Sequence, residues 1–184
     1  MESLCGASFV GQSGEKIMTY YSILKSPLGD VTLVANETEL TGLYFVNHRH
    51  MPQAKDGWTL NKKHPVLQKA EKELTEYFAG KRDSFSIPVN LGGTAFQKRV
   101  WKEIAAIPFG KTISYSELAK KAGAPKAARA AGAATGRNPV SVIVPCHRVM
   151  GKNNSMTGYG GGLERKQHLL ALENVELAIN KSNK

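Results

Sequence analysis

The sequence changes character at Gly92-Gly93, and this change constrains the possible folds more than any other feature. Before it, β-prone runs rich in Tyr, Ile, Thr and Val alternate with turn residues. After it, short helical patterns are separated by Gly and Pro. The 184 residues suffice for one domain or two small ones. We therefore expect an α+β protein with an extension over residues 1–17, an α/β domain over residues 18–92 and a helical domain over residues 93–184.

The first half predicts a meander of three strands followed by a helix. The strands are expected at residues 19–26, 31–36 and 40–46, with a turn at Pro27-Leu28-Gly29 between the first two. The polar residues 47–63 are expected to form a loop. Apolar residues then recur at helical spacing, which predicts a helix from Pro65 to Gly80.

The second half contains two capping boxes, which mark where helices begin. Thr94 with Gln97 predicts a helix over residues 95–106, and Ser114 with Glu117 predicts a short helix that ends at Lys121. Further helices are expected over residues 126–135 and from Leu163 to about Leu177. The helices around the turn at Gly123-Ala124-Pro125 have the outline of a helix-turn-helix, although many pairs of antiparallel helices share this pattern.

The segment 126–135 has an unusual composition for a DNA-reading helix. It is rich in alanine, and Arg129 is the one long side chain inside it. Small residues allow close approach to a duplex but carry little sequence information. This favours contact that is independent of base sequence, with one inserted side chain. The alternative is an alanine-rich core helix with Arg129 on its surface.

The charge of the chain is concentrated in the second half. Residues 1–92 hold 10 Lys+Arg and 10 Asp+Glu, whereas residues 93–184 hold 15 and 5, so the net charge of +10 belongs to the second half. This asymmetry favours an anionic partner, with nucleic acid first, over a merely solvated lysine-rich surface. No apolar run approaches the ~20 residues that span a bilayer, and two cysteines favour a reducing, cytoplasmic setting.

Cys146 is the strongest candidate for reactive chemistry. It lies in Pro145-Cys146-His147-Arg148-Val149, and nearby basic groups favour the nucleophilic thiolate. A buried, inert cysteine is the alternative. Neighbours on an extended segment point in opposite directions, so the proton acceptor could come from elsewhere, with Glu173 as a supporting carboxylate.

Two other candidate sites fail on spacing. Gly110-Lys111-Thr112 resembles the end of a phosphate-binding loop but lacks the required glycine at position 105. His48 and His50 alternate as on one face of a strand, but no paired ligand spacing accompanies them, so we expect no metal.

A reactive thiol in a DNA-binding half must act on a base, because phosphates offer it no obvious chemistry. A base inside a duplex is unreachable, so the target must be flipped out of the stack. Arg129 would then fill the gap, and the glycines near Gly160 would let the backbone lie close to the extruded base.

From Tyr20 to Glu173 the chain resembles the O6-alkylguanine-DNA alkyltransferases, also called methylated-DNA–protein-cysteine methyltransferases, and most closely their bacterial constitutive type. The resemblance is strongest from Gly93 onward. The matching segments are Gly93–Gln97 with Val100-Trp101, Ile107–Leu118, Pro125–Gly132, Asn138-Pro139, Pro145–Val149, and Tyr159 with Gly161–Leu163.

The resemblance implies an N-terminal domain of ribonuclease-H-like shape and a C-terminal domain with a winged-helix type of helix-turn-helix. It also implies a stoichiometric repair protein without cofactor or metal. Cys146 would accept the alkyl group from O6 of guanine, and from O4 of thymine. His147 would take the thiol proton through water, Glu173 would orient His147, and Tyr115 would donate toward the purine.

The remaining implied roles concern DNA and the substrate pocket. The chain would act as a monomer on the minor groove of double-stranded DNA with little sequence specificity. The implied DNA-binding residues are Arg129, Ala128, Ala130, Thr94, Gln97, Ser116 and Lys126. The implied pocket residues are Asn138, which would brace the active-site turn, Val149, Tyr159, Gly160, Pro145 and Arg148.

The chain departs from the family pattern in a few places. Gly160 stands where some relatives have Ser, which puts one hydrogen bond to the substrate oxygen in doubt. Some relatives bind zinc in the N-terminal domain. Only Cys5 could correspond to a ligand of that site here, so we expect no zinc. Two rival functions remain: a DNA-binding protein that recognises lesions or regulates without transfer, and a cysteine hydrolase that turns over.

Overall fold

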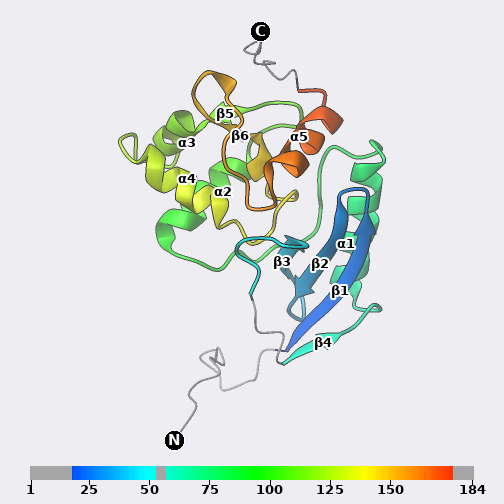
Figure 1. Cartoon of the computed structure of the whole chain (residues 1–184). Helices are drawn as coiled ribbons and strands as arrows, with labels where there is room; N and C mark the ends of the chain where they lie inside the picture. The colour runs from blue at the N-terminus through cyan, green and yellow to red at the C-terminus, as the bar shows by residue number, and fades with distance from the viewer. Residues whose placement is uncertain (1–17, 53–56, 176–184) are drawn as a thin grey trace, which may run out of the picture.

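The computed structural model describes residues 18–52 and 57–175 (Figure 1). Its N-terminal half is a four-stranded sheet made of β1 (Thr19–Ser26), β2 (Gly29–Ala35), β3 (Leu40–Phe45) and β4 (Trp58–Leu60). The strand order is β3-β2-β1-β4. The first three strands form the expected antiparallel meander, with Ser26 opposite Gly29 at the first turn. β4 is parallel to β1, so the sheet is mixed.

Helix α1 (Pro65–Phe78) covers one face of this sheet. Its buried residues Leu67, Ala70, Leu74 and Tyr77 form the stripe that the helical periodicity predicted. They join the apolar residues of β2 and β3 in one core. Val140, Val142 and Leu169 from the second half pack into the same core, so the sheet is built against the other half of the molecule.

The edge of β3 is covered by two segments that come from far along the chain. Leu40 N donates to Pro88 O at 2.9 Å, and Leu43 N donates to Pro139 O at 2.8 Å. An exposed strand edge is a liability because its backbone groups lack partners. The segment that leads to Cys146 is therefore fastened to the sheet edge a few residues before the cysteine.

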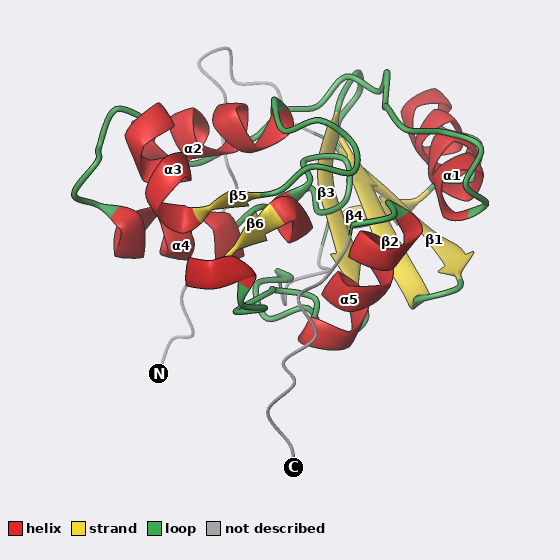
Figure 2. Ribbon diagram, turned by 90° about the horizontal axis from the view of Figure 1, so that it is seen from above, coloured by secondary structure: helices red, strands yellow, loops and turns green. Residues whose placement is uncertain are grey.

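The second half packs three helices around a second core. They are α2 (Ala95–Ala105), α3 (Tyr115–Lys121) and α4 (Ala128–Gly136), with Val100, Trp101 and Ile104 of α2 buried. Both predicted capping boxes are present, at Thr94 and Ser114. Figure 2 shows these helices grouped on one side of the molecule, and the sheet with α1 on the other. Among the described helices, none is long and apolar enough to cross a membrane.

Four small elements and a last helix complete the second half. β5 (Ile113–Ser114) and β6 (Val149–Met150) pair in parallel, and 3-10 turns lie at Cys146–Arg148 and Lys152–Asn154. Helix α5 (Leu163–Leu172) contacts the first of these turns. Leu169 and Leu170 bury its inner face. The α+β fold class and the helix-turn-helix formed by α3 and α4 are thus confirmed.

Several boundaries differ from the sequence prediction. Residues 47–63 are not all loop, because Trp58–Leu60 forms β4. The last helix ends at Leu172 rather than near Leu177, and Asn174 has a left-handed backbone with φ 56°. The alanine-rich helix begins at Ala128, two residues later than expected. The expectations for residues 1–17, for residues 176 and 177 of the last helix and for Cys5 lie outside the described residues.

Candidate active site

Cys146 opens a 3-10 turn, Cys146–Arg148, that leads into β6. The side chain is buried, with 4% of the residue exposed, and Sγ lies 4.0 Å from Ser141 Oγ. The backbone N–H of Cys146 donates to Val144 O at 2.8 Å. The thiol is therefore held on a tight turn in the core of the helical half rather than on an exposed loop at a strand exit.

Asn138 braces the segment that precedes the cysteine. Its buried Nδ2 donates to Val144 O at 2.7 Å, and its Oδ1 accepts from Val140 N at 3.0 Å. Between these two points Val142 has a φ of 71°. A β-branched residue in this conformation is strained, by about 1–3 kcal/mol. The Asn138 amide closes a strained turn that leads to Cys146.

Glu173, the C-cap residue of α5, is the centre of a buried hydrogen-bond network. Its Oε1 accepts from His147 Nε2 at 2.8 Å, Tyr77 Oη at 2.7 Å and Arg148 Nη2 at 2.9 Å. Its Oε2 accepts from Arg148 Nε at 2.8 Å and Gly110 N at 3.1 Å. Five donors thus converge on one carboxylate beside the cysteine turn.

The network keeps Glu173 ionised. Burial alone would raise the pKa of this carboxyl, but hydrogen bonds from His147, Arg148 and Tyr77 outweigh it and lower the pKa to about 2. An ionised carboxylate only accepts hydrogen bonds, so His147 Nε2 must be the donor in its pair with Glu173.

His147 is left with one unpartnered nitrogen. The residue is fully buried, and Nδ1 has no hydrogen-bond partner. Burial lowers the pKa of the imidazole, with Glu173 opposing, so the ring is neutral near pH 7. Because Nε2 carries the proton, Nδ1 carries a free lone pair. His147 is therefore an oriented base, one residue from the thiol.

The thiol itself is protonated in the resting protein. Burial raises the pKa of Cys146, while hydrogen bonds with Asn138 and Ser141 and the charge of Lys166 oppose this. The expectation that the adjacent basic side chains would favour the thiolate is wrong at this point. Both side chains turn to Glu173. A reaction at this sulfur would therefore require removal of the thiol proton.

Lys166 is a functional candidate that the sequence analysis missed. It is fully buried on α5, and its Nζ donates to Val149 O at 2.6 Å and to Thr157 O at 2.9 Å. Burial lowers its pKa to about 8, so the amine is still mostly charged at pH 7. The sequence contained a signal for this role, because Lys166 lies three residues before Leu169 within the apolar stripe of the last helix. A lysine is almost never fully buried unless its amine has partners.

Tyr77 is a second residue that was missed. It was expected only as an apolar core residue of the first helix, yet its hydroxyl reaches Glu173 from the N-terminal half. The phenol oxygen on a buried stripe was a signal, since a buried hydroxyl needs a partner. Its partner, 96 positions away, could not be read from the pattern.

A cavity of about 800 Å³ is lined by Tyr115 and Tyr159, two rings that also pack against the core containing Cys146, although Cys146 itself does not line the cavity. Tyr115 and Gly132 line one side, and the loop from Gly158 to Gly162 lines another. Burial raises the pKa of Tyr115 and Tyr159, and a charge on Cys146 would add to both shifts. The size falls within the range of small-molecule pockets. Three of the predicted site residues, Tyr115, Tyr159 and Gly160, thus meet here.

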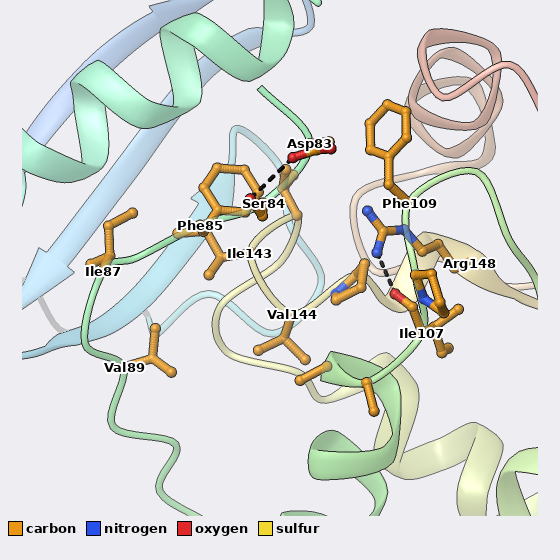
Figure 3. A pocket seen from close by; sticks show the side chains of 15 residues that line it. Asp83, Ser84, Phe85, Ile87, Val89, Ile107, Phe109, Ile143, Val144 and Arg148 are labelled. Carbon is orange, nitrogen blue, oxygen red and sulfur yellow. Dashed lines mark hydrogen bonds between the residues drawn. The ribbon is translucent and has the colours of Figure 1, made fainter. Parts of the chain in front are cut away.

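Other predicted pocket residues lie elsewhere. Pro145 and Arg148 line a separate hollow behind the turn, between residues 83–89 and residues 105–109 (Figure 3). There Arg148 Nη1 donates to Ile107 O at 2.5 Å. Val149 is buried, its N–H donates to Cys146 O, and its carbonyl accepts from Lys166.

The predicted DNA-binding residues lie at the start of three helices. Thr94 and Gln97 begin α2, Ser116 lies in the first turn of α3, and Ala128, Arg129 and Ala130 open α4 just after Lys126. Arg129, Ala130, Lys126 and Ser116 are exposed. Thr94 and Gln97 are engaged in the capping box, since Gln97 Oε1 accepts from Thr94 N at 2.9 Å.

The histidines considered for metal binding are not on a strand. β3 ends at Phe45, and His48 and His50 lie in the turn that follows. In the part of the chain that the structure describes, no group of three or more His, Cys, Asp or Glu is placed to hold an ion.

Comparison with known proteins identifies the family. Residues 19–91 match the ribonuclease-like domain of 6-O-methylguanine DNA methyltransferase, and residues 95–175 match its DNA-binding domain. The methylated-DNA–protein-cysteine methyltransferase of Mycolicibacterium paratuberculosis is 47% identical over 85% of this chain and 93% of the relative. That of Methanosarcina acetivorans is 43% identical over 84% of this chain and 97% of the relative.

Solved structures agree. A crystal structure of Mycobacterium tuberculosis OGT in complex with DNA has a TM-score of 0.78 and 44% identity, covering 84% of this chain and 92% of that one. An O6-methylguanine DNA methyltransferase from Methanococcus jannaschii has a TM-score of 0.60 and 30% identity, covering 89% and 99%. From these matches and the cysteine site, the chain belongs to the 6-O-methylguanine DNA methyltransferase family.

Proposed function

We propose that the protein repairs DNA by moving an alkyl group, methyl above all, from O6 of guanine, and from O4 of thymine, onto Cys146. The observation that carries this is the buried turn in which a lone thiol stands next to an oriented neutral imidazole. The family supports it, since relatives over nearly their whole length are methylated-DNA–protein-cysteine methyltransferases. The acceptor is consumed because a thioether has no easy route back to the thiol.

The proposed step is an in-line displacement. His147 Nδ1 takes the thiol proton through a bridging water, and Glu173 stabilises the imidazolium that forms. The sulfur lone pair attacks the alkyl carbon, and the C–O electron pair goes to the base. Tyr115, on the pocket wall, donates toward the purine and makes it a better leaving group. No cofactor or metal enters this balance.

The base must leave the duplex to reach the cavity. We propose that the starts of α2, α3 and α4 contact the DNA backbone through the minor groove, with little sequence specificity. Arg129 would fill the vacated position in the stack, because it is the exposed long side chain inside the alanine-rich α4. The thiol, base and pocket all come from one chain, which supports action as a monomer. A free thiol further favours a reducing compartment such as the cytoplasm.

A stoichiometric assay tests this function. The protein is titrated with duplex DNA that carries one O6-methylguanine, and its intact mass is followed. We expect the mass of one methyl group to be gained, saturating at one per protein. A protein that binds the duplex without a mass change would be a lesion-recognition or regulatory protein. Substrate turnover beyond one equivalent would indicate a hydrolase.

A further inference from the structure

Gly160, in the loop that lines the substrate pocket, lies directly against His48 of the N-terminal half. A Cβ built on Gly160 would be 2.5 Å from His48 Nε2, 2.9 Å from its Cε1 and 3.3 Å from Gly136 O. Real Cβ atoms do not approach other atoms as closely as the first two distances. The histidine ring thus occupies the volume that a side chain at position 160 would need.

Backbone conformation does not explain the glycine. Gly160 is absent from the described residues with positive φ, whereas its neighbour Gly162 has φ 95° with open space around it. Gly162 is therefore needed for its conformation, and Gly160 is needed for its lack of a side chain. The requirement at position 160 is set by a residue more than a hundred positions earlier in the chain.

The residues on either side of His48 line the pocket, whereas His48 itself is buried behind them, against Gly160. Asn47, Arg49 and His50 line the same cavity as Tyr115. Arg49 N donates to Gly160 O at 3.3 Å. The turn after β3 thus supplies one wall of a pocket whose other lining residues come from the C-terminal half.

A second contact fixes the pocket loop to the sheet. Arg165 Nη1 donates to Gly161 O at 2.7 Å, and its Nε donates to Leu28 O at 2.9 Å in the β1–β2 turn. Its guanidinium lies 5.0 Å from the centre of the Phe45 ring. The loop is therefore held at Gly160 and at Gly161, and His48 faces a backbone that cannot easily withdraw.

The orientation of the His48 ring follows from its hydrogen bond. His50 N donates to His48 Nδ1 at 3.2 Å, so Nδ1 carries the lone pair. Burial, together with His50 and Arg165, lowers the pKa of His48 to about 4, so the ring is neutral at pH 7. In this tautomer Nε2 carries the hydrogen and points at position 160.

We propose that His48 replaces a side chain at position 160: from the turn after β3 it backs the pocket wall, directs its Nε2–H at position 160, sets the position of the loop there, and thereby limits the size of the alkyl group that is transferred. This inference rests on the proposed function and deepens it. His48 is a specificity-determining residue, and it forms a matched pair with Gly160.

A double-mutant cycle tests the pair. The rates of single-turnover transfer are measured for the wild type, His48→Ala, Gly160→Ser and the double variant, on the same duplex with O6-methylguanine or O6-benzylguanine. We expect Gly160→Ser alone to slow methyl transfer by about tenfold or more, because the hydroxymethyl group collides with the ring. The double variant should recover most of that loss. Additive effects of the two substitutions would overturn the proposed pair.

The proposed limit on the size of the alkyl group is tested separately, by the ratio of the benzyl and methyl transfer rates. His48→Ala should raise the benzyl-to-methyl rate ratio by about tenfold, since a ring-sized volume opens in the wall. His168→Ala, a histidine exposed on α5, is the matched control and should keep the wild-type ratio. An unchanged ratio in His48→Ala would contradict the proposal even if Gly160→Ser failed to fold. A wild type that transfers no alkyl group would instead refute the proposed function.

Discussion

Glu173 shows how much of this site depends on residues that are distant in sequence. The carboxylate gathers donors from α1, from the residues that follow α2, and from the cysteine turn. The adjacency of Cys146, His147 and Arg148 in the sequence predicted a reactive segment there. It did not indicate that both basic side chains turn to Glu173, since that geometry depends on the 3-10 turn.

Glu173→Gln should make the protein less stable at pH 7 and less sensitive to acid. The folded pKa of Glu173 lies below its unfolded value, so its ionised form contributes stability above about pH 4.5 that is lost as pH falls toward 2. The shift corresponds to about 3 kcal/mol of unfolding free energy. Denaturant unfolding from pH 7 to pH 3 measures this. The difference between the two proteins should shrink with falling pH, and a constant difference would contradict the assignment.

Tyr77→Phe should shift the pH dependence of transfer. The loss of one donor leaves more negative charge on Glu173 Oε1 for His147, which raises the pKa of the imidazole. The acid limb of the rate profile should therefore move to higher pH, with a stability loss of about 1 kcal/mol. Tyr21→Phe is a control, because that ring packs against Trp58 on the far strand pair. A purely structural role for Tyr77 would lower stability and leave the pH profile in place.

Among the helices and strands, those specified by neighbouring residues were predicted well from the sequence. Those that depend on tertiary contacts were not. The capping boxes at Thr94 and Ser114 specify helix starts through neighbouring residues, so they are visible in the sequence. β4 was missed because its three residues form a strand only through parallel pairing with β1. The late start of α4 at Ala128 has a similar cause, since Ala127, its N-cap residue, has no capping side chain.

Arg129→Ala should slow repair in duplex DNA more than transfer from the free base O6-benzylguanine. The free base needs no flipping, so the inserted side chain contributes only in the duplex. Lys126→Ala removes one charge just before the same helix and is the matched control. It should weaken duplex binding without a selective effect on the chemical step. Equal losses on both substrates in Arg129→Ala would contradict the role in the base stack.

At the scale of the whole molecule, the charge asymmetry and the contacts between the two halves have different consequences. The net charge of +10 lies in residues 93–184, whereas the neutral N-terminal half supplies Tyr77 to Glu173 and His48 to the pocket loop. The change of character at Gly92-Gly93 is visible in the composition. The contribution of the N-terminal half to the site is not, because it depends on contacts such as Leu43 N to Pro139 O.

The logarithm of the Kd for DNA should rise linearly with the logarithm of the salt concentration, because Lys and Arg release counterions from the DNA when they bind its phosphates. Lys126→Ala should reduce the slope by about 1. Lys63→Ala, an exposed lysine of the neutral half, should leave it unchanged. Binding titrations at four salt concentrations give the slopes. Equal slopes for wild type and Lys126→Ala would place the DNA contact elsewhere.

The central claim is that Cys146 is the alkyl acceptor, and peptide mapping after reaction tests it most directly. The chain has two cysteines, so one acts as an internal control for the other. After reaction with a slight excess of O6-methylguanine duplex, we expect S-methylcysteine on the Cys146 peptide at one equivalent per protein. The Cys5 peptide should be unmodified, and Cys146→Ala should bind the duplex without gaining a methyl group. Methylation of Cys5, or methyl transfer to Cys146→Ala, would contradict the account.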